Sequence, residues 1–445
     1  MPYLRATRTS LIRRMPLGMY LYFPSSSSPE AFSPVMEIDE STEELLELCD
    51  GLHTREDILQ KLSEESGEST EAFAADFDAF IQYLVNEGVL EWTEVPSYVE
   101  PLYKRNKPLR ILAEITSVCS LQCPFCSVDA AKIQDDLTMD DIILLVDQMK
   151  KLKPTLLVLS GGEPLLKKDM VFYMVEELSP IRELDLYIFT NCTVLTKEYA
   201  QQLYDAGLRF VRVSVDGHTA QVHDAVRGKG TFEKTVQGIE HLKDVGINVT
   251  AVPLISRLNY QYFKEIKEFV SQIADSYNVS FDYPCGKAAG SHFLLSPEDR
   301  LKITLLDLGE NIETGIYPQN RCNIGEMLYI TSSGDCFPCL YMHFPEFNLG
   351  NVKKNSITDI YTQRMLQDML ELTVDDIEDC RNCDIRYYCR GGCRGFAYGE
   401  CGSLYALDPL NCEVIKGTAR RILECGEENT QQLMRKLIKS TQELR

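Results

Sequence analysis

Short apolar runs alternate with amphipathic stretches through the middle of the chain. Stretches with apolar residues at helical spacing, such as residues 139–152, separate runs that are typical of strands. The six strand-like runs are residues 110–116, 155–160, 185–190, 210–215, 248–253 and 279–283. Such alternation predicts a parallel sheet. Because six units are too few to close an eight-stranded barrel, we expect an α/β fold with an open, partial (β/α)6 barrel of the TIM type over residues 109–310.

The pattern over residues 1–96 is different. Residues 35–39 and 89–94 are typical of strands, and three short helices are expected between them. Ser41 with Glu44, and Thr54 with Asp57, match the capping box at the start of the first two helices. The third helix ends at Gly88 and has one apolar face, formed by Phe73, Phe77, Phe80, Ile81 and Leu84. This order predicts a small winged-helix module, followed by a linker over residues 97–108.

Composition narrows the class of protein. The 445 residues include 67 Asp and Glu against 45 Lys and Arg, a formal net charge of −22. That charge argues against DNA or RNA as the main partner. There is no apolar run of about eighteen residues, so we expect no membrane span. The basic N-terminal stretch is interrupted by Pro16 and Gly18 and does not resemble a secretory signal, so we expect a cytoplasmic protein.

The chain has sixteen cysteines, and most of them are clustered. In a reducing cytosol such cysteines are metal ligands or catalytic groups more often than disulfides. Cys49 and Cys192 stand alone and suit the simpler interpretation of buried apolar thiols. The clustered cysteines fall within residues 119–126, 322–339 and 380–412. These three segments are therefore the candidate metal sites.

The first cysteine segment directly follows the first predicted barrel strand, where such folds place their chemistry. Cys119, Cys123 and Cys126 could bind three of the four irons of a 4Fe–4S cluster and leave the fourth iron open to another ligand. Half of a zinc site is the alternative. A second motif, Gly161 to Pro164 (GGEP), follows the second strand, and its glycines allow close backbone approach.

Together these two motifs resemble the radical S-adenosylmethionine (SAM) superfamily. The resemblance implies reductive cleavage of SAM to a 5′-deoxyadenosyl radical, which takes hydrogen from the substrate. It also implies that Gly161, Gly162, Glu163 and Pro164 form the loop that meets the SAM amino group. Further cofactor contacts implied by it are Thr190 and Asn191, Ser214 and Asp216, and Arg227 on the SAM carboxylate. Cys192 stands where relatives often have glycine.

Residues 311–425 resemble the SPASM extension of radical SAM enzymes, which holds two auxiliary 4Fe–4S clusters. By this resemblance the outer cluster is held by Cys380, Cys383, Cys389 and Cys412. The inner cluster is held by Cys322, Cys339 and Cys393, with Gly334 five residues before Cys339. Its fourth ligand is Cys336, which we favour, or Cys285, or is missing. A zinc ribbon is the alternative for the paired cysteines. A helix over residues 426–445 closes the chain.

The winged-helix module resembles the precursor-peptide recognition element of ribosomal-peptide maturases and the peptide chaperone of pyrroloquinoline quinone biosynthesis. The resemblance implies that a leader peptide adds as a strand near Val35 to Ile38. The expected substrate is thus a ribosomally made precursor peptide, with flavodoxin or ferredoxin as electron donor. A cysteine thioether is the favoured product. Carbon–carbon or carbon–oxygen crosslinking and epimerisation are the alternatives.

Two other classes fit less well. Sulfatase maturation also uses a SPASM enzyme, but Leu340 follows Cys339 where that branch commonly has an aspartate base. A non-catalytic iron–sulfur protein would have no use for the GGEP loop or for an open three-cysteine site. We therefore expect a radical SAM peptide maturase with SAM and three 4Fe–4S clusters as cofactors.

Overall fold

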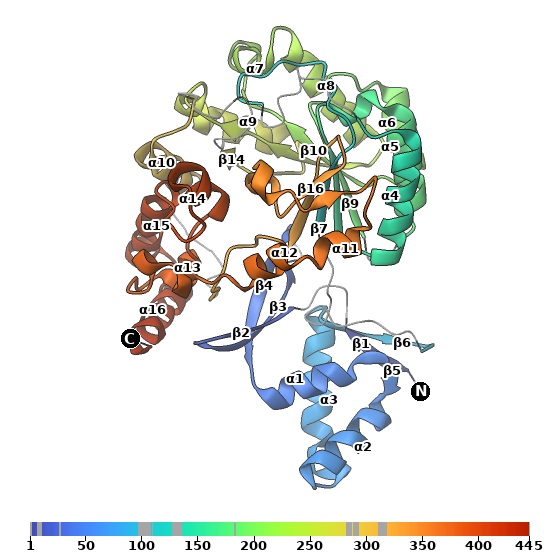
Figure 1. The fold of residues 1–445 in the computed structure, drawn as a ribbon, viewed down its shortest axis with the longest axis vertical. Helices are drawn as coiled ribbons and strands as arrows, with labels where there is room; N and C mark the ends of the chain where they lie inside the picture. The colour runs from blue at the N-terminus through green and yellow to red at the C-terminus, as the bar shows by residue number, and fades with distance from the viewer. Residues whose placement is uncertain are drawn as a thin grey trace. The chain divides into compact units, whose positions relative to one another are not determined.

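A computed structural model describes residues 2–6, 11–25, 28–96, 108, 110–126, 136–181, 184–281, 287, 293–309 and 318–444. The chain divides into two compact units (Figure 1). Unit 1 comprises residues 1–106, 315–318 and 440–445, and unit 2 comprises residues 107–314 and 319–439. Among the described helices, none is both long and apolar enough to cross a membrane.

Unit 1 is built from short strands and helices. One antiparallel sheet has the order β5 (Asp50–Thr54), β1 (Tyr3–Ala6), β6 (Leu90–Thr93), and a second has the order β2 (Leu11–Met15), β3 (Gly18–Ser25), β4 (Ser28–Ile38). The helices are α1 (Glu40–Leu48), α2 (Arg55–Ser66) and α3 (Thr70–Asn86). Leu4, Leu21, Ile58 and Leu84 lie in their shared core. The three predicted helices and both predicted strands are confirmed, whereas β1, β2, β3 and β5 were not predicted.

Of the two predicted capping boxes, the structure contains the second and not the first. The Thr54–Asp57 capping box is present at α2. At α1 the predicted Ser41–Glu44 box is wrong, because the Asp39 carboxylate accepts hydrogen bonds from Thr42 N at 2.8 Å and from the Ser41 hydroxyl at 2.9 Å. An aspartate two residues earlier satisfies the free amide, so the helix starts before Ser41.

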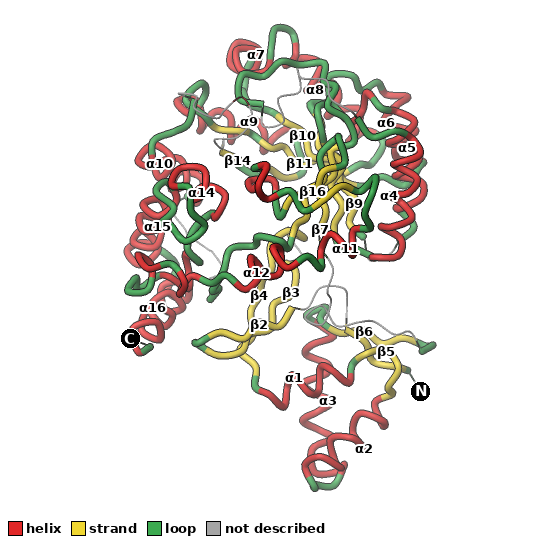
Figure 2. The backbone as a smooth tube through the Cα atoms, in the orientation of Figure 1, coloured by secondary structure: helices red, strands yellow, loops and turns green. Residues whose placement is uncertain are grey.

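The central sheet of unit 2 confirms the predicted parallel barrel strands. Its order from one edge is β13 (Ser276–Tyr277), β11 (Asn248–Val252), β10 (Phe210–Ser214), β9 (Asp185–Thr190), β8 (Leu156–Ser160) and β7 (Arg110–Glu114). These strands pair in parallel throughout. Helices α4 (Met139–Leu152), α5 (Lys168–Leu178), α6 (Lys197–Asp205), α8 (Thr231–Asp244) and α9 (Phe263–Ile273) pack against it (Figure 2).

The sixth barrel strand was predicted a few residues too late. Ser276 and Tyr277 pair with β11, whereas Ser280 and Phe281 form β14. Strand β14 pairs with β12 (Leu254–Ile255) in a separate two-stranded sheet. Pro253 separates β12 from β11, and its carbonyl accepts a hydrogen bond from Ser280 N at 2.9 Å. A proline has no amide hydrogen for the sheet, so the strand pair is interrupted there.

The cysteine-rich region contributes three strands to the same sheet. Strand β15 (Met327–Ile330) runs parallel to β7, and β16 (Asp335–Phe337) and β17 (Gly350–Asn351) follow it in antiparallel pairing. None of these strands was predicted. Tyr329 and Phe337 from this region pack with Leu112, Val158 and Tyr187 of the barrel strands.

Helices make up much of the remaining C-terminal sequence. They are α10 (Pro297–Leu308), α11 (Ile357–Tyr361), α12 (Arg364–Glu371), α13 (Arg386–Cys389), α14 (Arg394–Cys401), α15 (Asn411–Cys425) and α16 (Glu428–Glu443). Helix α10, which comes from the end of the barrel sequence, lies beside α15 (Figure 1). Helix α16 occupies most of the range predicted for the last helix.

Candidate functional site

One pocket gathers most of the residues expected around SAM. It lies at the carboxyl ends of the parallel strands, where Ser160 ends β8, Thr190 ends β9 and Ser214 ends β10. The predicted residues that line it are Cys119, Cys123, Cys126, Gly161, Gly162, Thr190, Asn191, Ser214 and Arg227. Glu163, Pro164 and Asp216 belong to the same loops but stand behind this lining.

The cluster loop and the GGEP loop are bound to each other through their backbones. Gly162 N donates to Thr116 O and Glu163 N donates to Val118 O, each at 2.8 Å. A Cβ atom at Gly161 would lie 2.3 Å from Thr116 O, and one at Gly162 would lie 2.3 Å from Val118 O. Both glycines are therefore required for contact with the cluster loop itself, and not only for approach to a cofactor.

Glu163 holds the GGEP loop against the loop that follows β9. Its side chain is fully buried, and Oε1 accepts hydrogen bonds from Thr190 Oγ1 at 2.7 Å and Leu165 N at 3.0 Å. Oε2 accepts from Asn191 N at 2.8 Å. Burial raises the pKa of Glu163 to about 6, against the effect of these donors. The carboxylate thus positions two loops, and the expected contact of the GGEP loop with the SAM amino group stays a prediction.

The loop after β9 has a glycine-like backbone conformation at Cys192. Cys192 has a φ of 64°, the left-handed conformation that glycine adopts without strain. Its side chain is fully buried. The conformation lets Asn191 Nδ2 approach Cys119 Sγ at 3.8 Å, within the range of a weak N–H···S hydrogen bond. The loop therefore links the β9 end directly to the cluster cysteines.

Arg227 and Asp216 form a buried ion pair beside the cluster loop. The Arg227 Nε donates to Asp216 Oδ2, and Asp216 Oδ1 accepts from Leu254 N at 2.9 Å. The guanidinium lies 5.6 Å from the centre of the Phe125 ring. Arg227 faces the pocket and Asp216 stands behind it, so Asp216 orients the arginine. The guanidinium also interacts with the Cys123 thiol, and its planar fork suits a carboxylate.

Burial favours the neutral thiol form of Cys119 and Cys123 in the pocket. Burial raises the pKa of Cys119 to about 11 and raises that of Cys123, where Arg227 opposes the effect. Iron binding by these thiols would release their protons. The donor set of three thiols in one pocket fits a cluster with one open iron.

Asp136 and Tyr341 also belong to the site and were missed in the sequence, whereas Leu340 was noted only as the residue after Cys339. Asp136 accepts hydrogen bonds from Ser117 N at 2.9 Å and from the Thr116 hydroxyl at 2.8 Å, so it fixes the start of the cluster loop. Leu340 and Tyr341 line the pocket from the cysteine-rich region. Their position directly after Cys339 was the only available signal. No signal marked Asp136, because its partners lie about twenty residues away.

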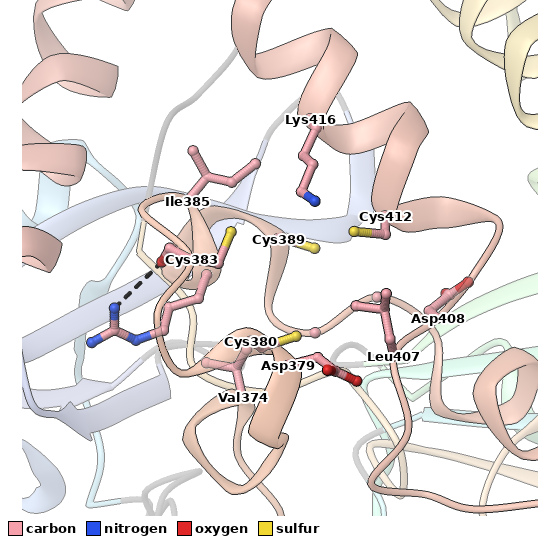
Figure 3. A pocket seen from close by; sticks show the side chains of 13 residues that line it. Val374, Asp379, Cys380, Cys383, Ile385, Cys389, Leu407, Asp408, Cys412 and Lys416 are labelled. Carbon is pink, nitrogen blue, oxygen red and sulfur yellow. Dashed lines mark hydrogen bonds between the residues drawn. The ribbon is translucent and has the colours of Figure 1, made fainter. Parts of the chain in front are cut away.

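The four cysteines predicted for the outer auxiliary cluster surround a second pocket. The sulfurs of Cys380, Cys383, Cys389 and Cys412 point into it (Figure 3). Burial raises the pKa of Cys380 to about 11 and that of Cys389 to about 12, and neighbouring thiolates add to both effects. Lys416, one helical turn after Cys412, also lines the pocket and lowers the pKa of Cys412 against its burial.

Three of the inner-cluster candidates are also close together. Burial raises the pKa of Cys339, and the charges of Cys393 and Cys322 raise it further. Cys336 behaves differently: it is fully buried in the core beside the sheet, its Sγ faces Gly334 O at 3.8 Å, and no other cysteine affects its pKa. The structure therefore places Cys336 apart from this group. Cys285, the other candidate, lies outside the described residues.

Within the described ranges, no group of three or more His, Cys, Asp or Glu side chains is arranged to hold a single metal ion. A 4Fe–4S cluster places a different requirement on its ligands, because each thiolate binds a different iron atom. The outer set of four thiols around one pocket fits such a cluster.

Comparison with known proteins identifies the domains. Residues 113–270 match the model of the radical SAM superfamily, residues 322–384 match that of the SPASM iron–sulfur cluster-binding domain, and residues 29–90 match coenzyme PQQ synthesis protein D (PqqD). The chain carries radical SAM, SPASM and PqqD domains. The family resemblance drawn from the cysteine and GGEP motifs is confirmed.

The chain has relatives of different named activities. It is 27% identical over 345 residues to an AdoMet-dependent heme synthase of Methanosarcina barkeri, which covers 68% of this chain and 96% of the relative. It is 23% identical over 354 residues to the mycofactocin maturase MftC of Mycolicibacterium smegmatis, covering 74% of this chain and 88% of the relative.

A solved structure extends the likeness over more of the chain. Streptococcus suis SuiB bound to the precursor peptide SuiA matches 92% of this chain and 99% of its own chain, with a TM-score of 0.63. The sequence identity is 15%, so this likeness concerns the fold. The shared fold includes far more than the radical SAM domain.

Proposed function

We propose that the protein is a radical SAM peptide maturase that crosslinks a ribosomally made precursor peptide. The proposal is supported most by the presence of two features in one chain. These are a three-cysteine pocket bound to the GGEP loop, and a PqqD domain of the kind that recognises precursor peptides. MftC is named as a maturase, and SuiB was solved with a precursor peptide.

In this proposal Cys119, Cys123 and Cys126 hold the cluster, and Gly161, Gly162, Ser214 and Arg227 surround SAM. When bound, cluster and SAM would together supply the radical that takes hydrogen from the peptide. The chain's own contribution is positional. Arg227, fixed by Asp216, would bind the SAM carboxylate, while Glu163 keeps the GGEP and β9 loops in register.

We place the leader peptide at strand β4. This strand lies at the end of its three-stranded sheet, in the order β2-β3-β4, so one side of its backbone is not paired within that sheet. An edge strand can accept a peptide by strand addition, in which backbone hydrogen bonds supply affinity. The predicted contact region, Val35 to Ile38, forms the end of β4.

The favoured product is a thioether from a peptide cysteine to a carbon atom, and a carbon–carbon crosslink is the runner-up. Both reactions remove two hydrogens from the peptide and leave an electron to be accepted. The two auxiliary clusters proposed for the SPASM region could accept that electron, and flavodoxin or ferredoxin would serve as external donor. A sulfatase-maturase reaction is disfavoured, because Leu340 lines the pocket at the position of the expected base.

Co-expression with the short reading frames that adjoin the gene tests the proposal. Mass spectrometry should show a peptide lighter by two hydrogens, and alkylation before digestion should show whether a cysteine thiol has been consumed. The matched control is a chain with Cys119, Cys123 and Cys126 all changed to alanine. An unmodified peptide with every adjoining frame, in cells where the enzyme cleaves SAM, would contradict the proposal.

A second candidate is porphyrin chemistry, because heme synthases are among the relatives with the highest identity. Those relatives align with about two thirds of this chain. The purified enzyme can be incubated with an iron-porphyrin precursor of heme and SAM under reducing conditions. Turnover of the porphyrin without modification of any peptide would favour this candidate over the peptide maturase.

A further inference from the structure

Arg394 is a fully buried cation that begins helix α14 directly after Cys393. It has the largest side chain among those less than 2% exposed. Its Nη1 donates to Leu404 O and to Ala406 O, each at 2.8 Å, and its Nη2 donates to Gly391 O. Backbone carbonyls therefore hold the guanidinium rigidly in the loop that connects the two cysteine groups.

The charge of Arg394 is not balanced by a carboxylate among the residues that the structure describes. Its Nε is buried and has no acceptor there. Asp408, the buried carboxylate of the same loop, is occupied by Cys393 N at 2.7 Å and by Asn411 N at 2.9 Å. A guanidinium stays charged at any pH of interest, and burying it without a counter-ion is costly. Such an arrangement calls for an anion on the Nε side.

Arg394 is adjacent to both auxiliary groups, through its guanidinium on the outer side and through its backbone on the inner side. Cys393, next to it in the chain, belongs to the inner group. Gly391, whose carbonyl accepts a hydrogen bond from Arg394, lines the outer pocket. The charge of Arg394 lowers the pKa of Cys380 and so opposes the effect of burial. Thiolate-bound 4Fe–4S clusters are anions, and their reduction potentials depend on nearby charge and on hydrogen bonds to sulfur.

We propose that Arg394 is the counter-cation shared by the inner and outer clusters, with Nε donating to a cluster or thiolate sulfur. This inference rests on the proposed function, in which both clusters bind. Reduction adds one negative charge to a cluster, so a fixed cation beside it stabilises the reduced form. Arg394 therefore raises the reduction potentials of both auxiliary clusters relative to a chain without the cation, and makes them better electron acceptors.

Redox titration followed by electron paramagnetic resonance tests this assignment. Arg394→Met should disfavour reduction of both auxiliary clusters by tenfold or more, a fall of ~59 mV per tenfold for a one-electron couple. Arg394→Lys keeps the charge and should lie much nearer the wild type. Arg420→Met removes an exposed cation from α15 and should change neither potential. The cluster at Cys119 serves as an internal reference in every variant.

Unchanged auxiliary potentials in Arg394→Met, at full iron content, would overturn the role of Arg394 and leave the proposed function intact. About four irons in the wild type would instead refute the auxiliary clusters, and Arg394's role with them. If the Arg394→Met variant does not assemble its clusters, wild-type protein labelled with ¹⁵N-arginine provides the test instead. Pulsed resonance should detect a nitrogen coupling to a reduced auxiliary cluster that Arg394→Lys lacks, and its absence from the wild type would overturn the proposal.

Discussion

The backbone amide of Asn191 donates a hydrogen bond of 2.8 Å to Oε2 of Glu163, whose carboxylate is fully buried. With the further bonds from Thr190 and Leu165, this carboxylate accepts three donors and offers none. The loops after β8 and β9 are therefore fixed to each other before any cofactor binds. Preorganisation of this kind lowers the cost of forming the bound geometry.

Glu163→Gln should destabilise the protein and weaken SAM binding. The amide NH2 group would face one of three donors and leave it unpaired, at a cost of about 1–3 kcal/mol. Thermal melting and equilibrium dialysis with SAM measure the two effects. Glu177→Gln is the control, because Glu177 forms only a half-exposed ion pair with Lys150 and should change little. Equal behaviour of the two variants would contradict the positioning role.

Gly162→Ala should separate the GGEP loop from the cluster loop. The new Cβ would lie 2.3 Å from Val118 O, a backbone atom that cannot move alone. A displacement of about 1 Å near reacting atoms can cost about a hundredfold in rate, so we expect a loss of that size in 5′-deoxyadenosine formation. Gly399→Ala is the matched control, since its Cβ would meet only the Phe344 ring at 3.4 Å. Similar losses in both variants would be inconsistent with the contact.

Cys192 should tolerate glycine better than valine. At a φ of 64° a glycine removes strain of about 1–3 kcal/mol, which offsets the loss of the buried thiol. A β-branched valine resists this conformation and should lower the melting temperature by several degrees. Cys49→Val provides the comparison, because Cys49 is equally buried but has a φ of −82°. We expect Cys192→Gly to keep SAM cleavage near the wild-type rate.

Glu114 should make the protein less stable as pH rises. Burial raises its pKa from 4.5 to about 7, although the Tyr329 hydroxyl donates to it. Because the folded state holds the proton more tightly, its stabilising effect is complete below pH 4.5 and is lost as pH rises through 7. Over this pH range the contribution of Glu114 to the free energy of unfolding falls by about 3 kcal/mol. Melting temperatures of Glu114→Gln should therefore rise relative to the wild type between pH 5 and pH 8.

The control for this pH dependence is Glu240→Gln, which changes an exposed glutamate on α8. Its melting temperature should follow that of the wild type at every pH. A constant difference between Glu114→Gln and the wild type over the same range would show that Glu114 titrates normally.

Local pattern was enough to predict the barrel and its first cluster loop. Three of the strands have four or more consecutive apolar or β-branched residues, and the cysteines of CxxxCxxC are neighbours in sequence. The sixth strand has only two paired residues, which is too short for a pattern. Strand β15 has only four residues and lies in cysteine-rich sequence, where the alternation of strands and helices fades.

Contacts between distant residues could not be predicted. The role of Glu163 depends on donors 27 and 28 residues away, and the unbalanced charge of Arg394 depends on burial. Cys336 is the opposite case, in which the sequence suggested a contact that the structure does not contain. Its spacing suited a ligand, but strand β16 directs its side chain into the core beside the sheet, away from the other inner cysteines.

The pairing of β15 with β7 has a consequence for how the chain is made. Met327 to Ile330 cover the edge of β7, which is more than two hundred residues earlier. Until those residues leave the ribosome, the backbone of β7 stays open on that side and could pair with another nascent chain. The cysteine-rich region is therefore also the segment that completes the barrel, and a chain truncated before residue 327 should aggregate even though its whole SAM motif is present.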